Sequence, residues 1–207
     1  DKLPPVITPP GEVCTYSNLG NALAGYLVEV VSGQDFAEYA NEHIFKPLEM
    51  NRSSFRLPDS LAPDLVKGYF HRNGGYLNIP FDFLNDYPAG QMIATATDMA
   101  KFMIAHLQLG NYEGRQILSE STVKAMHSKQ FSHHPKLDDN YGGFAFGVGS
   151  IRGQKLSAHD GGYLGAATRM WLLPESDIGI YMACNTMNSR LNNDVTRQLA
   201  ERLFPAE

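Results

Sequence analysis

Apolar residues recur at helical spacing through the first part of the chain. Ser17 and Asn18, residue types that cap helix N-termini, precede the first run, and Gly33 stands where a helix would end. The apolar members of this run are Leu19, Leu23, Tyr26, Leu27, Val30 and Val31. The pattern predicts a helix between residues 18 and 33.

A second helix is predicted from residue 34 or 35 up to Pro47, which cannot continue it. Its single apolar face carries Phe36, Tyr39, Ala40, His43 and Ile44. On such a face, we interpret His43 as a core or boundary histidine rather than a catalytic one.

Three further helices are indicated by the same spacing. Thr97-Asp98 caps a predicted helix that ends near Gly110, and a short helix is expected from about Ser121 to His127. The apolar positions are Met99, Phe102, Met103, His106 and Leu107 in the first of these helices, and Leu191, Val195, Leu199 and Leu203 in a final helix. The final helix has one apolar stripe with which it can pack on a sheet.

Between Met50 and Gly90 the apolar residues follow neither the helical spacing nor the alternation of a strand, and proline and glycine recur. Aromatic residues recur through it, namely Phe55, Tyr69, Phe70, Tyr76, Phe81, Phe83 and Tyr87. A long loop of this kind either forms the wall of a binding site or covers the core, with its aromatic side chains inserted between core residues. The sequence leaves both interpretations open.

From Tyr141 onward the apolar residues alternate, which is typical of strands. Strands are predicted around Phe144 to Val148 and over residues 155–159, 166–173 and 178–185, and the turn at residues 174–177 makes the last two a hairpin. The fold class is therefore α+β, with a helical lobe over about residues 12–140 and an antiparallel sheet with a C-terminal helix over about residues 141–207.

Composition narrows the class of protein. The 207 residues are 43% hydrophobic and 19% charged, which is ordinary for a globular domain, and the formal net charge of −5 argues against a nucleic-acid-binding protein. No apolar stretch approaches the length of a membrane span. The chain opens at Asp1 without a methionine or a signal peptide, so we interpret it as a mature form or a fragment.

Neither a metal nor a cofactor is expected. Cys14 and Cys184 lie far apart in the sequence, without disulfide-framework or metal-ligand spacing, and are interpreted as buried free thiols. A second mixture of possible ligands, His133, His134, Asp138 and Asp139, lies in a polar stretch without regular spacing. A solvated loop explains this stretch better than a metal site does.

Two short segments carry candidate chemistry. His159-Asp160-Gly161-Gly162 follows an apolar strand, and its glycines allow either a close approach to a ligand or a tight bend. Tyr16-Ser17-Asn18 opens the first helix, where the tyrosine is either an acid–base group or a packed aromatic before a helix cap.

The following segments occur in one order along the chain: Pro10-Gly11, Tyr16-Ser17-Asn18, Val31-Ser32-Gly33, residues 44–50, Pro88-Ala89-Gly90-Gln91, residues 95–98, His159-Asp160-Gly161-Gly162, Leu173-Pro174-Glu175, Gly179 and Asn185. In this order and spacing the chain resembles the serine β-lactamase and penicillin-binding-protein superfamily, in its class C, esterase and D-aminopeptidase-like branch. The resemblance covers nearly the whole chain.

The resemblance implies nucleophilic catalysis, in which a serine of a Ser-x-x-Lys helix forms an acyl-enzyme that water then cleaves. It implies that Tyr16 moves the serine proton to the leaving group, and that Asn18 binds the substrate amide and the lysine. His159 would contribute to the polar wall of the site, and Gly161 would give the strand clearance for the ligand. The backbone N–H of Gly162 would donate to the oxyanion.

The chain departs from the family in one respect. The family's Ser-x-x-Lys precedes the tyrosine motif, whereas the only such string here, Ser121-Thr122-Val123-Lys124, follows it. Ser121 is better interpreted as a helix cap than as the nucleophile. We therefore expect the C-terminal portion of a longer enzyme, incomplete at the N-terminus of its sheet. A natural inactive homologue is the lesser alternative.

The function expected from the resemblance is serine hydrolysis of an amide or ester, such as a β-lactam, a D-amino-acid peptide or a small ester. The alternatives are a non-catalytic binding or regulatory homologue and an unrelated structural α+β domain. The expected partners are a small-molecule substrate and either a second polypeptide carrying the missing segment or a second copy of the chain. The resemblance also implies a periplasmic or other extracytoplasmic location.

Overall fold

Helices dominate the first half of the chain and strands the second. The computed structural model describes residue 9, residue 12 and residues 14–132, 140–187 and 189–205. The α-helices are α1 (Asn18–Ser32), α2 (Phe36–Ala40), α3 (Ala96–Leu107), α4 (Glu120–Met126) and α5 (Ser189–Leu203). Three shorter helical segments are the π-helix η1 (Asn41–Phe45) and the 3-10 turns η2 (Ala62–Asp64) and η3 (Tyr87–Ala89).

The strands form one large sheet and two hairpins. The sheet contains β5 (Phe131–Ser132), β6 (Asn140–Gly142), β7 (Gly147–Ile151), β8 (Gln154–Tyr163), β9 (Ala166–Leu173) and β10 (Ile178–Cys184). The hairpins are β1 (Gly68–Arg72) with β2 (Gly75–Ile79), and β3 (Asn111–Tyr112) with β4 (Arg115–Gln116). All pairs of the large sheet are antiparallel, in the order β10-β9-β8-β7-β6-β5.

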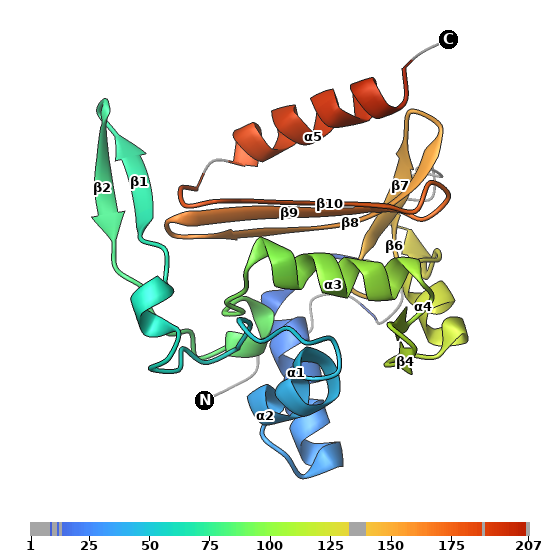
Figure 1. Cartoon of the computed structure of the whole chain (residues 1–207), viewed down its shortest axis with the longest axis horizontal. Helices are drawn as coiled ribbons and strands as arrows, with labels where there is room; N and C mark the ends of the chain where they lie inside the picture. The colour runs from blue at the N-terminus through green and yellow to red at the C-terminus, as the bar shows by residue number, and fades with distance from the viewer. Residues whose placement is uncertain (1–8, 10–11, 13, 133–139, 188, 206–207) are drawn as a thin grey trace.

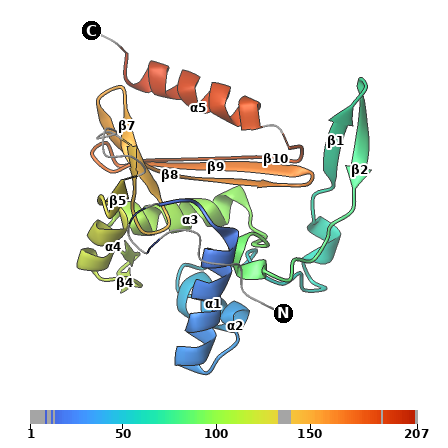
Figure 2. The same cartoon turned by 180° about the vertical axis from the view of Figure 1, so that it is seen from behind.

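The molecule is layered. Helix α3 crosses one face of the sheet and α5 lies over the other, while α1 and α2 lie beyond α3 (Figure 1). The view from behind shows the same layers, with the β1–β2 hairpin at one end of the sheet and α4 near the other (Figure 2). The predicted α+β architecture is confirmed. Because β5 also joins the sheet, its strands begin earlier than the predicted boundary near residue 141.

Two apolar clusters fill the layers. Between α3 and the sheet lie the buried side chains of Met103, Phe146, Val148, Met170 and Leu172. Under α2 and η1 lie those of Ala40, Phe45, Leu48, Met50, Ala105 and Tyr112. Helix α3 contributes to both clusters, since its Met103 faces the sheet and its Ala105 faces the helical layer.

Helix α1 begins and ends where the sequence predicts. The Ser17 Oγ accepts a hydrogen bond from the Gly20 N–H at 3.0 Å, and Gly33 ends the helix in the left-handed region at φ 72°. Its six apolar side chains, however, are between 46% and 86% exposed, and Gly25 is the only buried residue of the helix. The apolar period therefore predicts the helix correctly but not a buried face within this chain.

The second predicted helix is present as α2 continued by η1. Asp35 caps it by accepting hydrogen bonds from the Ala37 and Glu38 N–H groups. His43 lies in the π-helical turn with an exposed side chain, its ring 4.2 Å from that of Tyr39. The prediction of a core or boundary histidine at this position was wrong, because the wider π-turn changes the direction of the side chains that follow Ala40.

The stretch predicted to be irregular contains the β1–β2 hairpin. Asn73 and Gly74 form its turn, with φ values of 50° and 77°. Asparagine followed by glycine is the residue pair that favours a two-residue hairpin turn, because both adopt positive φ at low cost. The Asn73-Gly74 pair is therefore a local sequence signal for this hairpin, in a stretch that was predicted to be irregular.

The caps of two helices also differ from the prediction. Helix α3 is capped by the Thr95 Oγ1, which accepts from the Asp98 N–H at 3.2 Å, so the predicted cap at Thr97-Asp98 lies inside the helix. Ser119 caps α4, and Ser121 stands within its first turn instead of capping it.

Helix α5 packs on the sheet with a different face from the leucine stripe that was predicted to do so. Leu191, Leu199 and Leu203 are exposed and Val195 is half-buried, while Asn192, Thr196 and Ala200 are buried. The small residues of this second face allow the helix to approach β9 and β10 closely.

Cys14 and Cys184 are partly buried rather than buried, and they form no disulfide bond. The polar stretch with His133, His134, Asp138 and Asp139 lies outside the described residues.

Candidate functional site

The site predicted from the sequence lies along strand β8, which is longer than its neighbour β7. Strand β7 begins at Gly147, which pairs with Ala158 of β8. Beyond that point β8 continues from His159 to Tyr163, paired with β9 on one side. On its other side no strand of the described chain pairs with it. His159 therefore lies in the middle of a strand, not at its end, and Gly161-Gly162 continue that strand rather than forming a bend.

The direction of the backbone groups along this open edge follows from the turns. Leu164 and Gly165 form a two-residue turn between β8 and β9, so Tyr163 and Ala166 exchange the hydrogen bonds that close the hairpin. Because successive residues of a strand direct their N–H and C=O groups to opposite sides, Asp160 and Gly162 direct theirs to the open edge.

Side chains along β8 divide between the two faces of the sheet. His159 pairs with Met170, whose side chain packs with Met103 of α3, so the His159 side chain is on the face toward the helical layer. Asp160 pairs with Arg169 on the opposite face. His159 and Gly161, two residues apart, therefore share the face of α3.

The segment before α1 brings Tyr16 to this strand. The rings of Tyr16 and His159 have centroids 6.3 Å apart and an interplanar angle of 54°. Tyr16 is 67% exposed, so its hydroxyl is accessible to a ligand. Asn18 is the first residue of α1 and is also exposed, but within the described structure no hydrogen bond or ring contact joins it to Tyr16 or His159.

An open pocket of about 380 Å³ lies at this edge. Its lining residues are Tyr16, Gly147, Ala158, His159, Asp160, Arg169 and Trp171. Arg169 and Trp171 were not predicted from the sequence, because only the register of β8 against β9 places them opposite Asp160 and Ala158.

Arg169 organises one wall of the pocket. Its Nε donates to Asp160 Oδ1 at 2.8 Å and its Nη2 to Asp160 Oδ2, while its guanidinium carbon lies 5.7 Å from the centroid of the Trp171 ring. Exposed ion pairs contribute about 0–1 kcal/mol to stability. The pair therefore serves mainly to hold the two side chains in place, since a bidentate geometry restricts both.

The two glycines of the motif have different surroundings. A Cβ on Gly161 would lie 2.4 Å from Thr168 Oγ1, so a side chain there is excluded by the neighbouring strand. A Cβ on Gly162 would meet nothing within 4 Å. The clearance that the resemblance assigns to Gly161 is thus clearance from Thr168 in this structure, while the space beside Gly162 is open.

The Ser-x-x-Lys string lies on α4, near the other end of the sheet from the β1–β2 hairpin (Figure 1). Lys124 forms an ion pair with Glu120, and the Ser121 Oγ is 2.9 Å from the Ser119 Oγ. Neither Ser121 nor Lys124 lines the pocket beside Tyr16 and His159. This serine therefore lacks the neighbours that a nucleophile requires.

The described residues offer neither a cluster of metal ligands nor a membrane-spanning helix. No group of three or more His, Cys, Asp or Glu side chains within the described ranges is placed to hold a metal ion. Among the helices described, none combines the length and the apolar character needed to cross a membrane.

An antiparallel sheet with helices on both faces, and a tyrosine at the start of a helix beside a His-x-Gly strand, define a class of protein. The class is the serine β-lactamase and penicillin-binding-protein-like superfamily. A family model described as "Beta-lactamase" matches residues 2–203. The chain belongs to the β-lactamase family and has its fold.

Similar proteins and solved structures support this family assignment. The chain is 28% identical over 192 residues to unguisins hydrolase ungD' of Aspergillus campestris, covering 87% of this chain and 35% of that protein. In structure it matches the octameric penicillin-binding protein homologue from Pyrococcus abyssi with a TM-score of 0.80 and 24% identity, over 96% of this chain and 46% of that one. It matches D-amino acid amidase from Ochrobactrum anthropi with a TM-score of 0.68 and 20% identity, over 93% of this chain and 59% of that one.

The lengths of these relatives differ from that of the chain. The chain spans 35% of the curated hydrolase and between 46% and 59% of the two solved structures.

Proposed function

We propose that this chain forms the tyrosine and histidine side of the active site of a serine hydrolase, and that the nucleophilic serine belongs to a segment outside these 207 residues. The observation that carries the proposal is the position of Tyr16, exposed and 6.3 Å from His159 by ring centroids, at the open edge of β8. The sheet edge, the pocket and the residue types there fit the acyl-transfer chemistry expected from the family.

The proposed reaction proceeds through an acyl-enzyme. The serine Oγ attacks the substrate carbonyl carbon, the new C–O bond forms, and the amide C–N or ester C–O bond breaks. Tyr16 carries the serine proton to the leaving group, and water then hydrolyses the acyl-enzyme. Asn18 orients the substrate amide, and His159 forms the polar wall of the pocket beside Tyr16.

The open edge of β8 supplies the electrostatic part of the mechanism. The Gly162 backbone directs its N–H toward the side that β7 does not cover. A Cβ on Gly162 would meet nothing within 4 Å, so the sheet face at this residue is also open. A donor in this position stabilises the negative charge that develops on the carbonyl oxygen. Thr168 leaves no room for a side chain at residue 161, so glycine at this position allows β8 to continue along the edge.

The proposed substrates are amides or esters. Among the structural neighbours are a D-stereospecific amidohydrolase and a D-amino acid amidase, at 22% and 20% identity. At this identity they support the fold, and they make small D-amino-acid amides sensible first substrates to test beside β-lactams and p-nitrophenyl esters. The proposed location, outside the cytoplasm, rests on the family resemblance alone.

The exposed apolar surface supports a covering segment. Helix α1 presents six exposed apolar side chains, and β10 has one edge that no strand of the described chain pairs with. Exposed apolar faces and open strand edges are typical contact surfaces. The covering segment belongs to the same longer polypeptide, to a second polypeptide, or to a second copy of this chain.

The proposal is tested by comparing the 207-residue chain with a longer protein that includes the preceding coding sequence. The longer protein should hydrolyse nitrocefin, a p-nitrophenyl ester or a D-amino-acid amide, and the chain alone should hydrolyse none of them. Turnover by the isolated chain at the rate of the longer protein would contradict the external nucleophile.

A non-catalytic binding homologue is the second candidate, favoured by the position of Ser121-x-x-Lys124 away from the pocket. The preceding coding sequence distinguishes the two candidates. A Ser-x-x-Lys upstream supports the hydrolase, and its absence together with ligand binding but no turnover supports the binding protein.

A further inference from the structure

Helix α1 is attached to the molecule by its C-terminal half. Its buried residue, Gly25, lies so close to η3 that a Cβ there would be 2.6 Å from the Cβ of Pro88. The N-terminal half, which carries the candidate residue Asn18 and follows directly from Tyr16, has no buried residue. The orientation of Tyr16 and Asn18 relative to β8 therefore depends on contacts made more than one helical turn away.

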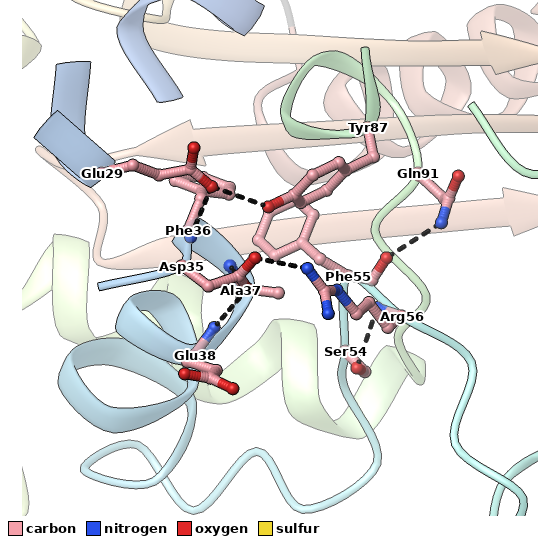
Figure 3. Close-up of polar contacts among 10 residues, drawn as sticks. All are labelled: Glu29, Asp35, Phe36, Ala37, Glu38, Ser54, Phe55, Arg56, Tyr87 and Gln91. Atoms are coloured by element: carbon pink, nitrogen blue, oxygen red, sulfur yellow. Dashed lines mark hydrogen bonds and ion pairs between the residues drawn. The ribbon is translucent and has the colours of Figure 1, made fainter. Parts of the chain in front are cut away.

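The Glu29 carboxylate makes polar contacts that hold this part of α1. The Glu29 Oε1 accepts a hydrogen bond from the Phe36 backbone N–H at 3.0 Å and another from the Tyr87 hydroxyl at 3.3 Å (Figure 3). It thereby links α1 to the first residue of α2 and to the first residue of η3. The bond from Tyr87 is long for an O–H···O contact, so the bond from Phe36 is the stronger of the two.

The groups around Glu29 keep its partners in place. The Phe36 and Phe55 rings meet edge to face at 4.9 Å, and Arg56 lies over the Tyr87 ring, 5.8 Å from its centroid, while pairing with Asp35. Burial raises the pKa of Tyr87. The Tyr87 hydroxyl therefore stays protonated at neutral pH and donates a hydrogen bond to Glu29.

We propose that Glu29 and Tyr87 are positioning residues for the active site, a role that rests on the proposed function of Tyr16 and Asn18. Asn18 lies about 16 Å along the helix from Glu29, at 1.5 Å per residue. A tilt of roughly 4° at the anchor moves that end of the helix by about 1 Å. A displacement of this size at a catalytic group can lower the rate by up to about a hundredfold.

The contact between Tyr16 and His159 provides a readout that does not depend on activity. We would record the nuclear Overhauser contact between the two rings by NMR in the longer protein that contains these residues, with His159→Gln to assign the signal. Glu29→Leu should abolish the contact, Tyr87→Phe should weaken it, and Glu29→Gln should retain it because the amide oxygen still accepts both bonds.

Two controls make the result decisive. Glu42→Leu removes an exposed glutamate of η1 that accepts only from Gln34 among the contacts described, and it should leave the Tyr16–His159 signal unchanged. The pair formed by the buried His106 and the half-buried His127 reports on the rest of the fold. The proposal is overturned if Glu29→Leu keeps the Tyr16–His159 contact, or if that variant loses the His106–His127 signals as well.

Kinetics in the longer protein separate this proposal from the function itself. Glu29→Leu should lower kcat by between about tenfold and a hundredfold with little change in KM, and Glu29→Gln should restore it. If the unsubstituted longer protein is inactive, the proposed function fails while the NMR contact still decides the positioning role. If it is active and Glu29→Leu leaves kcat unchanged, the positioning role fails alone.

Discussion

At the scale of single residues, His106 and His127 form a contact that acid should disrupt. The Nδ1 of His106 lies 3.0 Å from the Nε2 of His127, and the Phe146 ring packs against both imidazoles. Burial lowers the pKa of each to about 4, with the neighbouring His127 adding to the effect on His106 and Lys155 adding to the effect on His127. Both rings are therefore neutral in the folded protein at neutral pH.

This pair should make the fold less stable in acid. Both folded-state pKa values lie below the ordinary value of 6.5, so the unfolded chain binds protons first as the pH falls. The stabilisation is fully present above about pH 6.5 and is lost as the pH falls toward 4. Urea unfolding at several pH values should show a loss on the order of 3 kcal/mol across this range.

Substitution identifies the groups responsible. His127→Gln should make the dependence of unfolding free energy on pH shallower, whereas His43→Gln, at an exposed histidine, should leave its slope unchanged. An unchanged slope in His127→Gln would show that other groups titrate in this range.

Tyr16 tests the chemistry assigned to a single hydroxyl. In the longer protein, Tyr16→Phe should lower kcat by between about a hundredfold and ten-thousandfold, because the proton-transfer group is lost while the ring remains. Circular dichroism should show an unchanged fold, since the side chain is 67% exposed. Activity within about threefold of the unsubstituted protein would reduce Tyr16 to a packing residue.

At the scale of elements, the attachment of α1 is the feature with the clearest steric test. Gly25→Ala would place a methyl group 2.6 Å from Pro88 Cβ and should destabilise the protein by about 1–3 kcal/mol. Gly20→Ala in the same helix meets nothing closer than 3.5 Å and should be neutral or stabilising by up to about 1 kcal/mol. Equal unfolding free energies for the two variants would show that α1 does not depend on this contact.

Elements with strong local signals were predictable from the sequence. Ser17 and Gly33 define both ends of α1, and the turn at residues 174–177 ends β9 where the sequence predicts. The exposure of the α1 face was not predictable, because the period of apolar residues says which side is apolar but not what covers it. The length of β8 beyond His159 was also missed, since glycine weakens the strand pattern of Gly161-Gly162.

The site could be predicted only in part. Tyr16 and His159 were selected from two motifs, and the structure brings their rings together. Arg169 and Trp171 depend on a register between strands that short motifs do not encode. The roles of Tyr16, Asn18, His159, Gly161 and Gly162 remain predictions from the family resemblance.

At the scale of the whole molecule, the open edge of β10 and the apolar face of α1 should promote association. We expect sedimentation of the isolated chain to show self-association or poor solubility. Leu27→Glu on the α1 face and Ala183→Lys on β10 should each reduce it. Val66→Glu, at an exposed loop position, should have no effect. A monodisperse, sharply melting monomer would contradict the covering segment.

In the proposed serine hydrolase, this chain contributes the tyrosine and histidine side of the active site, and the nucleophilic serine lies in a segment outside it. The most direct measurement is peptide mapping of the longer protein, or of this chain combined with the missing segment, after reaction with a fluorescent penicillin. The expected result is a covalent adduct on a serine outside the 207 residues and no adduct on the isolated chain. An adduct on Ser121 would contradict the account.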